Sequence, residues 1–255
     1  MSPVLKDKVA IITGASRGFG KAFALRFAEE GARLLLTTTS LERAQGTVNE
    51  VKAKGGEAAI MEADISREDA PKKIAEKVMQ QYGRVDILVN NAAIWYGTNA
   101  KPWDAWTVEE WDRMFTVNVR GNWLVCKAIA PLMIKQSSGK IINIASDIFK
   151  VPDSQFFLPY ALTKSAIYTM THSLAAALGP SGINVNGIAP GYAATEASLG
   201  QDGSEQLFES VVAGQAIHRR VEAEDVVGAA VFLASADSDL ITGQLIIIDG
   251  GHVMI

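Results

Sequence analysis

Cysteine is almost absent from this sequence, since Cys126 is the single one among 255 residues. One thiol excludes an intrachain disulfide, and a chain of this length can bury a full hydrophobic core without one. We therefore expect a reducing compartment, the cytoplasm. Cys126 lies in the apolar run 123–129, which favours a small core residue over a nucleophile.

Basic charge, long apolar runs and clustered histidines are also lacking. The 24 Lys and Arg against 28 Asp and Glu give a net charge of −4, so the basic surface that nucleic acid requires is excluded. No run approaches the roughly 20 apolar residues that span a bilayer, and no signal peptide is visible, so no membrane partner is expected. His172, His218 and His252 lack the spacing of metal ligands, so no metal is expected either.

Short apolar runs alternate with longer segments of helical periodicity. Several runs are apolar on both faces, as parallel strands covered by helices are. The expected strands are Val9–Thr13, Arg33–Thr37, Glu57–Met61, Ile87–Asn90, Lys140–Ala145, Ile183–Ile188 and Leu245–Ile248. The expected helices lie near 18–30, 41–54, 67–82, 107–135, 160–178 and 223–235. This order predicts an α/β fold, a doubly wound parallel sheet of about seven strands with helices on both faces.

No repeat, low-complexity tract or linker divides the chain, so 1–255 is expected to be one domain. The segment 195–220 is less periodic and carries Gly200, Gly203 and Gly214. It is interpreted as an insertion before the last helix. A lid over the substrate and a plain surface excursion both remain open for it.

A glycine-rich turn directly follows the first expected strand and opens a helix. Its sequence, Gly14-Ala-Ser-Arg-Gly18-Phe-Gly20, has the spacing Gly-x3-Gly-x-Gly. Glycines permit a tight turn and close approach of the backbone to a pyrophosphate, and the helix N-terminus then offers free N–H groups to it. A nucleotide cofactor is therefore expected here. The absence of Gly-Lys-Ser/Thr argues against a P-loop kinase or GTPase.

This spacing resembles that of the short-chain dehydrogenase/reductase family, and further motifs follow in the order of that family. They are Asn90-Asn91-Ala92-Ala93, Asn118 in Phe-Thr-Val-Asn-Val, Ser146 in Ile-Asn-Ile-Ala-Ser, Tyr160-x3-Lys164, Pro190-Gly191 with Thr195, Ile241-Thr-Gly-Gln and Asp249-Gly-Gly. Ala93 departs from the family, which has glycine there. A positive φ at this position would cost alanine about 1 kcal/mol.

The resemblance covers nearly the whole chain and implies an NAD(P)-binding Rossmann-type domain. It implies a catalytic set of Asn118, Ser146, Tyr160 and Lys164, in which Asn118 holds a water that links the lysine to solvent. It also implies a homotetramer formed through the long central helices and the last strand. The expected cofactor-binding residues are Gly14, Ser16, Arg17, Gly18, Phe19, Gly20, Thr38, Thr39, Asp64, Ile65, Asn91, Ala92, Tyr160, Lys164, Pro190, Gly191 and Thr195.

The residue types suit hydride transfer to a carbonyl group. The developing alkoxide needs a proton, which a phenol such as Tyr160 can give and take back. Lys164 lies one helical turn away, and its ammonium group favours the phenolate. Ser146 can donate a hydrogen bond to the substrate oxygen.

The end of the second strand bears on the choice of cofactor. A carboxylate there would bind the ribose hydroxyls of NAD, but the sequence reads Thr37-Thr38-Thr39-Ser40. We expect no arginine after this strand to contact the cofactor, whereas Arg17 in the glycine turn can pair with a 2′-phosphate. NADP(H) is therefore favoured over NAD(H).

The expected substrate pocket is rich in aromatic residues, which suits a hydrophobic, aromatic or alicyclic secondary alcohol or ketone. Its candidate residues are Trp95, Tyr96, Ser146, Phe149, Phe157 and Tyr192. A 3-oxoacyl-carrier-protein reductase is the first alternative. It needs a basic patch for an acidic carrier, and the sequence offers Lys135, Lys140, Arg219 and Arg220. A non-enzymatic nucleotide-binding protein on the same fold is the second alternative.

Overall fold

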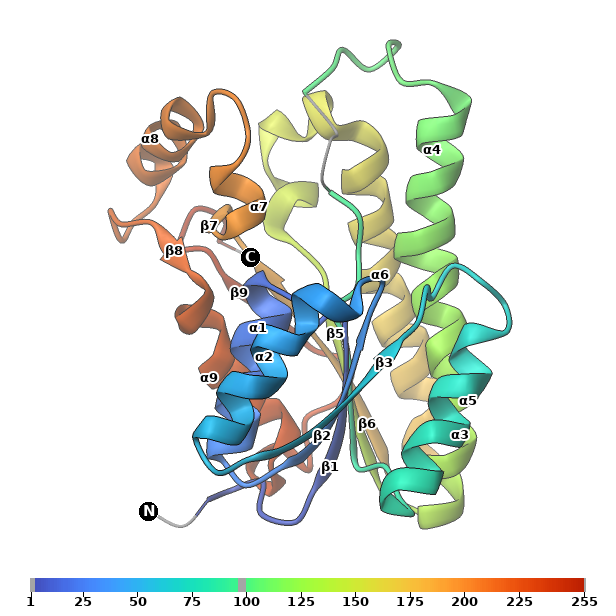
Figure 1. The fold of residues 1–255 in the computed structure, drawn as a ribbon. Coiled ribbons are helices and arrows are strands. Elements are labelled where there is room, and N and C mark those ends of the chain that lie inside the picture. The colour runs from blue at the N-terminus through green and yellow to red at the C-terminus, as the bar shows by residue number, and fades with distance from the viewer. Residues whose placement is uncertain (1–2, 96–99, 255) are drawn as a thin grey trace.

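The computed structural model describes residues 3–95 and 100–254. Seven parallel strands form one sheet in the order β3-β2-β1-β4-β5-β6-β9 (Figure 1). The strands are β1 (Val9–Thr13), β2 (Arg33–Thr38), β3 (Glu57–Glu62), β4 (Ile87–Asn90), β5 (Gly139–Ile144), β6 (Ile183–Pro190) and β9 (Leu245–Ile248). Each expected strand is present, within two residues at either end.

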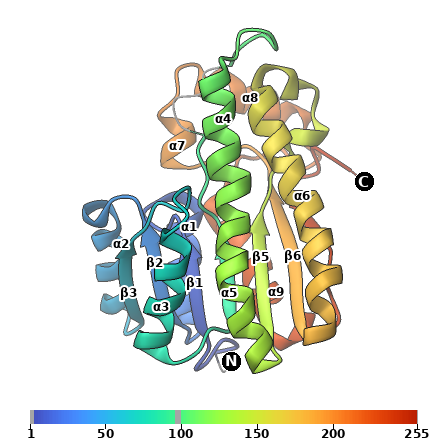
Figure 2. The same cartoon turned by 90° about the vertical axis from the view of Figure 1, so that its right-hand side faces the viewer.

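Helices cover both faces of this sheet (Figures 1 and 2). One face carries α1 (Gly18–Glu29), α2 (Leu41–Ala53) and α9 (Ala223–Ala234), and the other carries α3 (Ala70–Tyr82), α5 (Asn122–Gln136) and α6 (Leu158–Leu178). The prediction of a doubly wound α/β fold is therefore confirmed.

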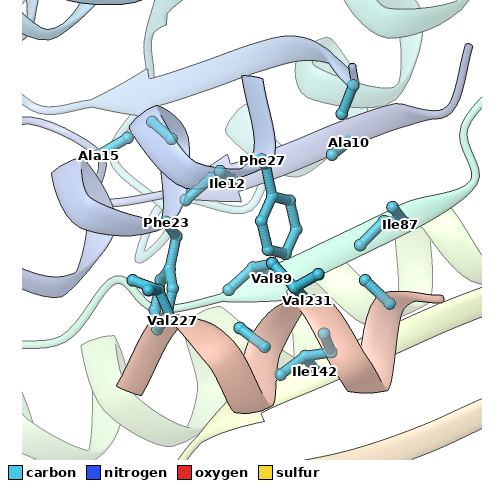
Figure 3. Close-up of a cluster of buried hydrophobic side chains, with 14 of the residues drawn as sticks. Ala10, Ile12, Ala15, Phe23, Phe27, Ile87, Val89, Ile142, Val227 and Val231 are labelled. Carbon is cyan, nitrogen blue, oxygen red and sulfur yellow. The ribbon is translucent and has the colours of Figure 1, made fainter. Parts of the chain in front are cut away.

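Successive residues of the central strand supply two separate hydrophobic cores. Ala10 and Ile12 of β1 pack with Phe23 and Phe27 of α1 on one face (Figure 3). Val9 and Ile11 join the core of the opposite face with residues of α3 and α5. A strand that is buried on both faces reads as a continuous apolar run, because its side chains alternate between two cores. Cys126 is confirmed as a core residue, being 1% exposed.

The prediction of a helix near 107–135 is confirmed, since the chain is helical without a break from 108 to 136, but the helix is not uniform. The segment consists of α4 (Val108–Phe115), a π-helical turn η1 (Thr116–Gly121) and α5. A π turn inserts an extra residue into the helix and re-aims the side chains that follow. Here it carries Asn118, which is fully buried. The apolar periodicity of the segment gave no sign of this insertion.

The segment 195–220 contains two helices, α7 (Glu196–Leu199) and α8 (Ser204–Gly214). A short parallel pair, β7 (Ala193–Ala194) with β8 (Val221–Glu222), brackets it at both ends. Phe208 of α8 is buried, and its ring lies 4.4 Å from that of Tyr192. The insertion is therefore anchored to the main body at its base and through contacts that include the Tyr192–Phe208 ring pair.

The chain reverses its direction across the sheet between β1 and β4. From β1 it proceeds outward through β2 to β3, and the remaining strands lie on the other side. In such sheets a ligand binds at the carboxyl ends of the strands near this switch point. Within the described residues, no helix is both long enough and apolar enough to cross a bilayer.

Candidate active site

A cleft of about 660 Å³ opens at the carboxyl ends of the central strands. It extends from Thr38, at the end of β2, past Ser146, beyond β5, to Tyr192, beyond β6. Thus it spans both sides of the switch point, where the fold places a ligand. Most of the residues singled out in the sequence lie on its wall.

The glycine turn between β1 and α1 forms one wall of the cleft. Gly14 and Gly18 have φ values of 67° and 52°, which side chains disfavour. A Cβ on Gly20 would lie 2.2 Å from the carbonyl oxygen of Gly14, so this helix residue must also be glycine. The turn can therefore bring the first N–H groups of α1 close to a bound group.

An anionic oxygen already occupies the start of α1. The backbone N–H of Gly18 donates a hydrogen bond to Oε2 of Glu196 in α7, at 3.0 Å. The N-terminus of a helix favours negative charge because its dipole and unpaired N–H groups point there. This carboxylate shows that the glycine turn can bind an anion. The turn and the start of α1 therefore fit the pyrophosphate of a dinucleotide.

Asn91 fastens the end of β4 to the glycine turn. Its side-chain amide donates to the carbonyl oxygens of Thr13 and Gly14 at 2.9 and 3.0 Å. The following Ala92 and Ala93 line the cleft. Among the described residues other than glycine, those with positive φ are Asp7 and Ser137, so Ala93 carries no backbone strain. The replacement of the family's glycine is therefore tolerated.

Ser146, Tyr160 and Lys164 all line the same part of the cleft. Lys164 is 3% exposed, and its Nζ donates to the carbonyl oxygen of Ile144 at 2.8 Å. Nζ lies 5.5 Å from the centre of the Tyr160 ring. Burial lowers the pKa of Lys164 to about 8, because the charged form loses its solvent. A cation held below the phenol is the arrangement that acid–base work by Tyr160 requires.

Asn118 lies beneath this group and is not among the residues that line the cleft. Its Oδ1 accepts from the N–H of Ile94 at 2.8 Å, and its amide donates to Thr163 Oγ1 at 3.2 Å. It therefore links the loop after β4 to the helix turn that carries Lys164. Its described contacts are structural, and the water that the family resemblance implies stays a prediction.

The cleft wall includes residues that the sequence analysis did not single out, and Arg43 bears on the choice of cofactor. Besides the expected Ser16, Arg17, Phe19, Thr38, Thr39, Asp64, Ile65, Pro190, Gly191 and Thr195, the wall includes Arg43. Arg43 lies in the first turn of α2, so the chain does place an arginine shortly after the second strand. Because Arg43 is separated from the end of β2 in the sequence, its position at the cleft was not predicted. The turn at Ser40 brings Arg43 back toward the cleft.

The aromatic candidates for the substrate pocket divide into residues that line the cleft and residues that pack away from it. Trp95 and Tyr192 line the cleft, and the Trp95 ring lies 4.5 Å from that of Tyr160. Phe157 packs behind Trp95 at 4.7 Å and is 8% exposed. Tyr96 lies outside the described residues.

The structure does not place Phe149 on the wall of the cleft. Its ring stacks on Tyr168 of α6 at 5.7 Å, because the 3₁₀ turn η2 (Asp147–Lys150) rotates it away. Asp147 and Ile148, which the sequence did not single out, line the cleft in its stead. Within the described ranges, no three His, Cys, Asp or Glu residues form a group that could hold a metal ion.

Comparison with known proteins agrees with this geometry. A family model described as Enoyl-(Acyl carrier protein) reductase matches residues 14–252. The chain is 35% identical over 250 residues to the 3-oxoacyl-[acyl-carrier-protein] reductase FabG of Thermotoga maritima, covering 98% of this chain and 99% of the relative. It is 36% identical over 260 residues to galactitol 2-dehydrogenase of Agrobacterium fabrum, covering 98% and 99%. The crystal structure of a short-chain type dehydrogenase/reductase from Mycobacterium marinum matches with a TM-score of 0.92 at 30% identity, covering 100% and 98%.

Proposed function

The chain belongs to the short-chain dehydrogenase/reductase family, whose members are NAD(P)-dependent oxidoreductases of CH–OH and C=O groups, and from that premise we propose its substrates. We propose that it transfers a hydride between NADP(H) and a hydrophobic, aromatic or alicyclic secondary alcohol or ketone. Tyr160 is the acid and base of this reaction. The reading of the chain as a non-enzymatic nucleotide-binding protein is set aside.

One observation carries the proposed mechanism, which is the buried Lys164 beneath Tyr160 in a cleft that Ser146 shares. The nicotinamide cofactor, when bound, supplies or accepts the hydride. Ser146 Oγ donates a hydrogen bond to the substrate oxygen and holds it. Tyr160 gives its phenolic proton to the alkoxide that develops, and Lys164 stabilises the phenolate that remains.

The preference for NADP(H) rests on two arginines. Arg17 of the glycine turn and Arg43 of α2 line the cleft together with Thr38 and Thr39. A guanidinium binds phosphate through two parallel hydrogen bonds, which a ribose hydroxyl cannot match. Thr39 is exposed there, whereas the Thr38 hydroxyl is engaged with the backbone of Ser40 at 3.0 Å. The arginines therefore support the phosphate contact more strongly than the threonines.

Apolar side chains support a hydrophobic substrate. Trp95, Ile148 and Tyr192 line the cleft on the side of Ser146. The nearby contact of Tyr192 with Phe208 in α8 supports a role for 195–220 as a lid over the bound substrate. Such walls favour a ring or another bulky group on the carbonyl carbon.

A 3-oxoacyl-carrier-protein reductase, as in the relative from Thermotoga maritima, is the second candidate. Such an enzyme needs unpaired basic side chains to bind an acidic carrier. Three of the four cations considered for this role form ion pairs within the chain: Lys140 with Asp239, Arg219 with Asp225 and Arg220 with Glu205. The paired charges favour the small hydrophobic ketone over the carrier.

A homotetramer in the cytoplasm completes the proposal. Trp123 and Ile134 on α5 are 44% and 43% exposed, and Leu162 on α6 is 39% exposed. All four residues of the edge strand β9 are partly exposed as well. Apolar surfaces of this kind mark protein contacts. Light scattering during gel filtration would give the mass of the assembly, and a monomer would contradict the proposal.

The first experiment follows the absorbance of NADPH and of NADH with a panel of aryl ketones, cyclic ketones and an acetoacetyl thioester. We expect faster NADPH consumption with the ring-bearing ketones. Tyr160→Phe should lower kcat about 10²- to 10⁴-fold while the NADPH affinity stays unchanged, since only the transferable proton is lost. Turnover of the thioester alone would favour the carrier-protein reductase, and a fall of cofactor binding in Tyr160→Phe would point to a structural tyrosine.

A further inference from the structure

Asp147 directly follows Ser146 and places a buried carboxylate at the cleft. It begins the 3₁₀ turn η2, is 5% exposed, and lines the cleft beside Ser146. The proposed hydride transfer does not use it. A buried carboxylate at a substrate cleft needs hydrogen-bond donors, because burial without them is costly.

The neighbouring Asp249 is a carboxylate with a hydrogen-bond donor for each of its oxygens. Its two oxygens accept from the backbone N–H groups of Gly251 and Val253, at 2.9 and 2.7 Å. Asp147 has longer contacts, since Oδ1 lies 3.4 Å from Ser146 Oγ and Oδ2 lies 3.7 Å from His252 Nδ1. Asp249 therefore stabilises its loop, whereas Asp147 keeps capacity to accept a further hydrogen bond.

The residues around Asp147 leave the cleft as the side from which its carboxylate can accept a further hydrogen bond. His252 faces Oδ2, and a Cβ on Gly214 at the end of α8 would lie 3.0 Å from the His252 ring, so this side is closed. Oδ1 accepts a long hydrogen bond from Ser146 Oγ, a hydroxyl that in the proposed reaction donates to the substrate oxygen instead and so leaves Oδ1 open to another donor. Burial raises the pKa of Asp147 to about 6, Asp249 adds repulsion, and His252 and Ser146 oppose the rise. The carboxylate is therefore mainly ionised at neutral pH and accepts hydrogen bonds.

We propose that Asp147 determines substrate specificity by accepting a hydrogen bond from a hydroxyl group on the carbon next to the reacting carbonyl. The inference rests on the proposed function and narrows its substrate to a hydrophobic α-hydroxyketone or the corresponding vicinal diol. Ser146 Oγ and Asp147 Oδ1 lie 3.4 Å apart, a separation that suits two oxygens on adjacent carbons. The apolar residues of the wall hold the rest of the molecule.

A hydroxyl group fits this carboxylate better than an ammonium group does. Lys164 already places a cation in the same cleft, and the oxidised nicotinamide adds another positive charge. A second ammonium group would be repelled by both and would lose its own solvent on entry. A neutral donor avoids both costs.

The test compares matched substrates, 2-hydroxycyclohexanone with cyclohexanone and 2-hydroxyacetophenone with acetophenone, using NADPH. In the natural chain we expect kcat/KM to favour each hydroxyketone by about tenfold to a hundredfold, the range of a hydrogen bond to a charged group. Asp147→Leu should reduce this ratio to about one, and Asp147→Asn should leave it in between, since a neutral acceptor remains. Asp153→Asn removes an exposed carboxylate outside the cleft and should leave the ratio unchanged.

A ratio near one in the natural chain, or a ratio that Asp147→Leu preserves, would overturn the inference. Isothermal titration of the same ketones into the enzyme with NADP⁺ separates this failure from failure of the proposed function. Absence of turnover with preferred binding of the hydroxyketones would overturn the reductase proposal and support the role of Asp147. Equal binding, or none, would overturn the role of Asp147 itself. If Asp147→Leu does not fold, Asp147→Asn and the natural chain decide.

Discussion

The two halves of the cleft are built in different ways. The cofactor half depends on backbone geometry at the glycine turn, where Gly18 N–H donates at the start of α1 and Asn91 holds the Gly14 carbonyl oxygen, and Arg17 and Arg43 also line it. The substrate half is lined by residues from the loops after β4, β5 and β6, and His252 of the C-terminal loop lies against Asp147. Backbone geometry tolerates few substitutions, whereas side chains can change with the substrate. We therefore expect the first half to serve cofactor binding in general and the second half to set substrate specificity.

Gly20→Ala is expected to have the largest effect on NADPH binding by the cofactor half of the cleft. The added Cβ would lie 2.2 Å from the Gly14 carbonyl oxygen, so the turn must shift. We expect NADPH affinity to fall at least about a hundredfold, since positioned N–H groups act together. Gly46→Ala is the matched control. Its Cβ would meet nothing within 4 Å, and it should raise stability by about 0.5–1 kcal/mol. Fluorescence titration with NADPH and thermal unfolding of both variants provide the measurements.

The double variant Arg17→Ala, Arg43→Ala probes the side chains of the same half. We expect the Kd for NADPH to rise about 10- to 100-fold and the Kd for NADH to stay nearly constant, because the 2′-phosphate alone loses its charged partners. Titration with both cofactors measures this. An equal loss for both would assign the arginines to the pyrophosphate instead.

Lys164→Met tests whether the buried lysine lowers the stability of the fold. Burial lowers the pKa of Lys164 from 10.5 to about 8 in the folded chain, so the unfolded chain binds the proton more tightly. Lys164 therefore destabilises the fold below pH 8, and this effect fades as the pH rises toward 10.5. We expect Lys164→Met to abolish activity but to stabilise the fold at pH 7 by about 1–3 kcal/mol. Denaturant unfolding at pH 7 and pH 10 checks it, and an equal gain at both values would contradict the burial argument.

The smallest effect is expected for Glu196→Gln, which joins the two halves. The Glu196 carboxylate accepts from Gly18 N–H at the start of α1, where the pyrophosphate would otherwise bind. Removing its charge should tighten NADPH binding about two- to fivefold, in line with the energy of one charge at a helix terminus. Titration at low and high salt measures the gain, which should shrink with salt. Weaker binding would show instead that Glu196 organises the turn.

Prediction from the sequence succeeded differently in these two halves. Seven strands and the glycine turn were identified within two residues, because continuous apolar runs and glycines at positive φ are visible in the local sequence. Phe149 was misplaced, since the 3₁₀ turn after Ser146 sends its ring to Tyr168. Arg43 and the π turn around Asn118 were missed. Neither has a local signal, because each depends on how one helix begins or bends against the rest of the chain.

The order of strands and helices, the glycine turn and the spacing of Tyr160 and Lys164 could all be predicted from the sequence alone. These features depend on residues that are neighbours in the chain, so their periodicity and spacing record them. Only the tertiary structure decided that Asp147 meets His252 from the C-terminal loop, and that Glu196 reaches Gly18. Such contacts join residues far apart in the chain. Their geometry follows from packing of the whole sheet and its helices, which no local pattern contains.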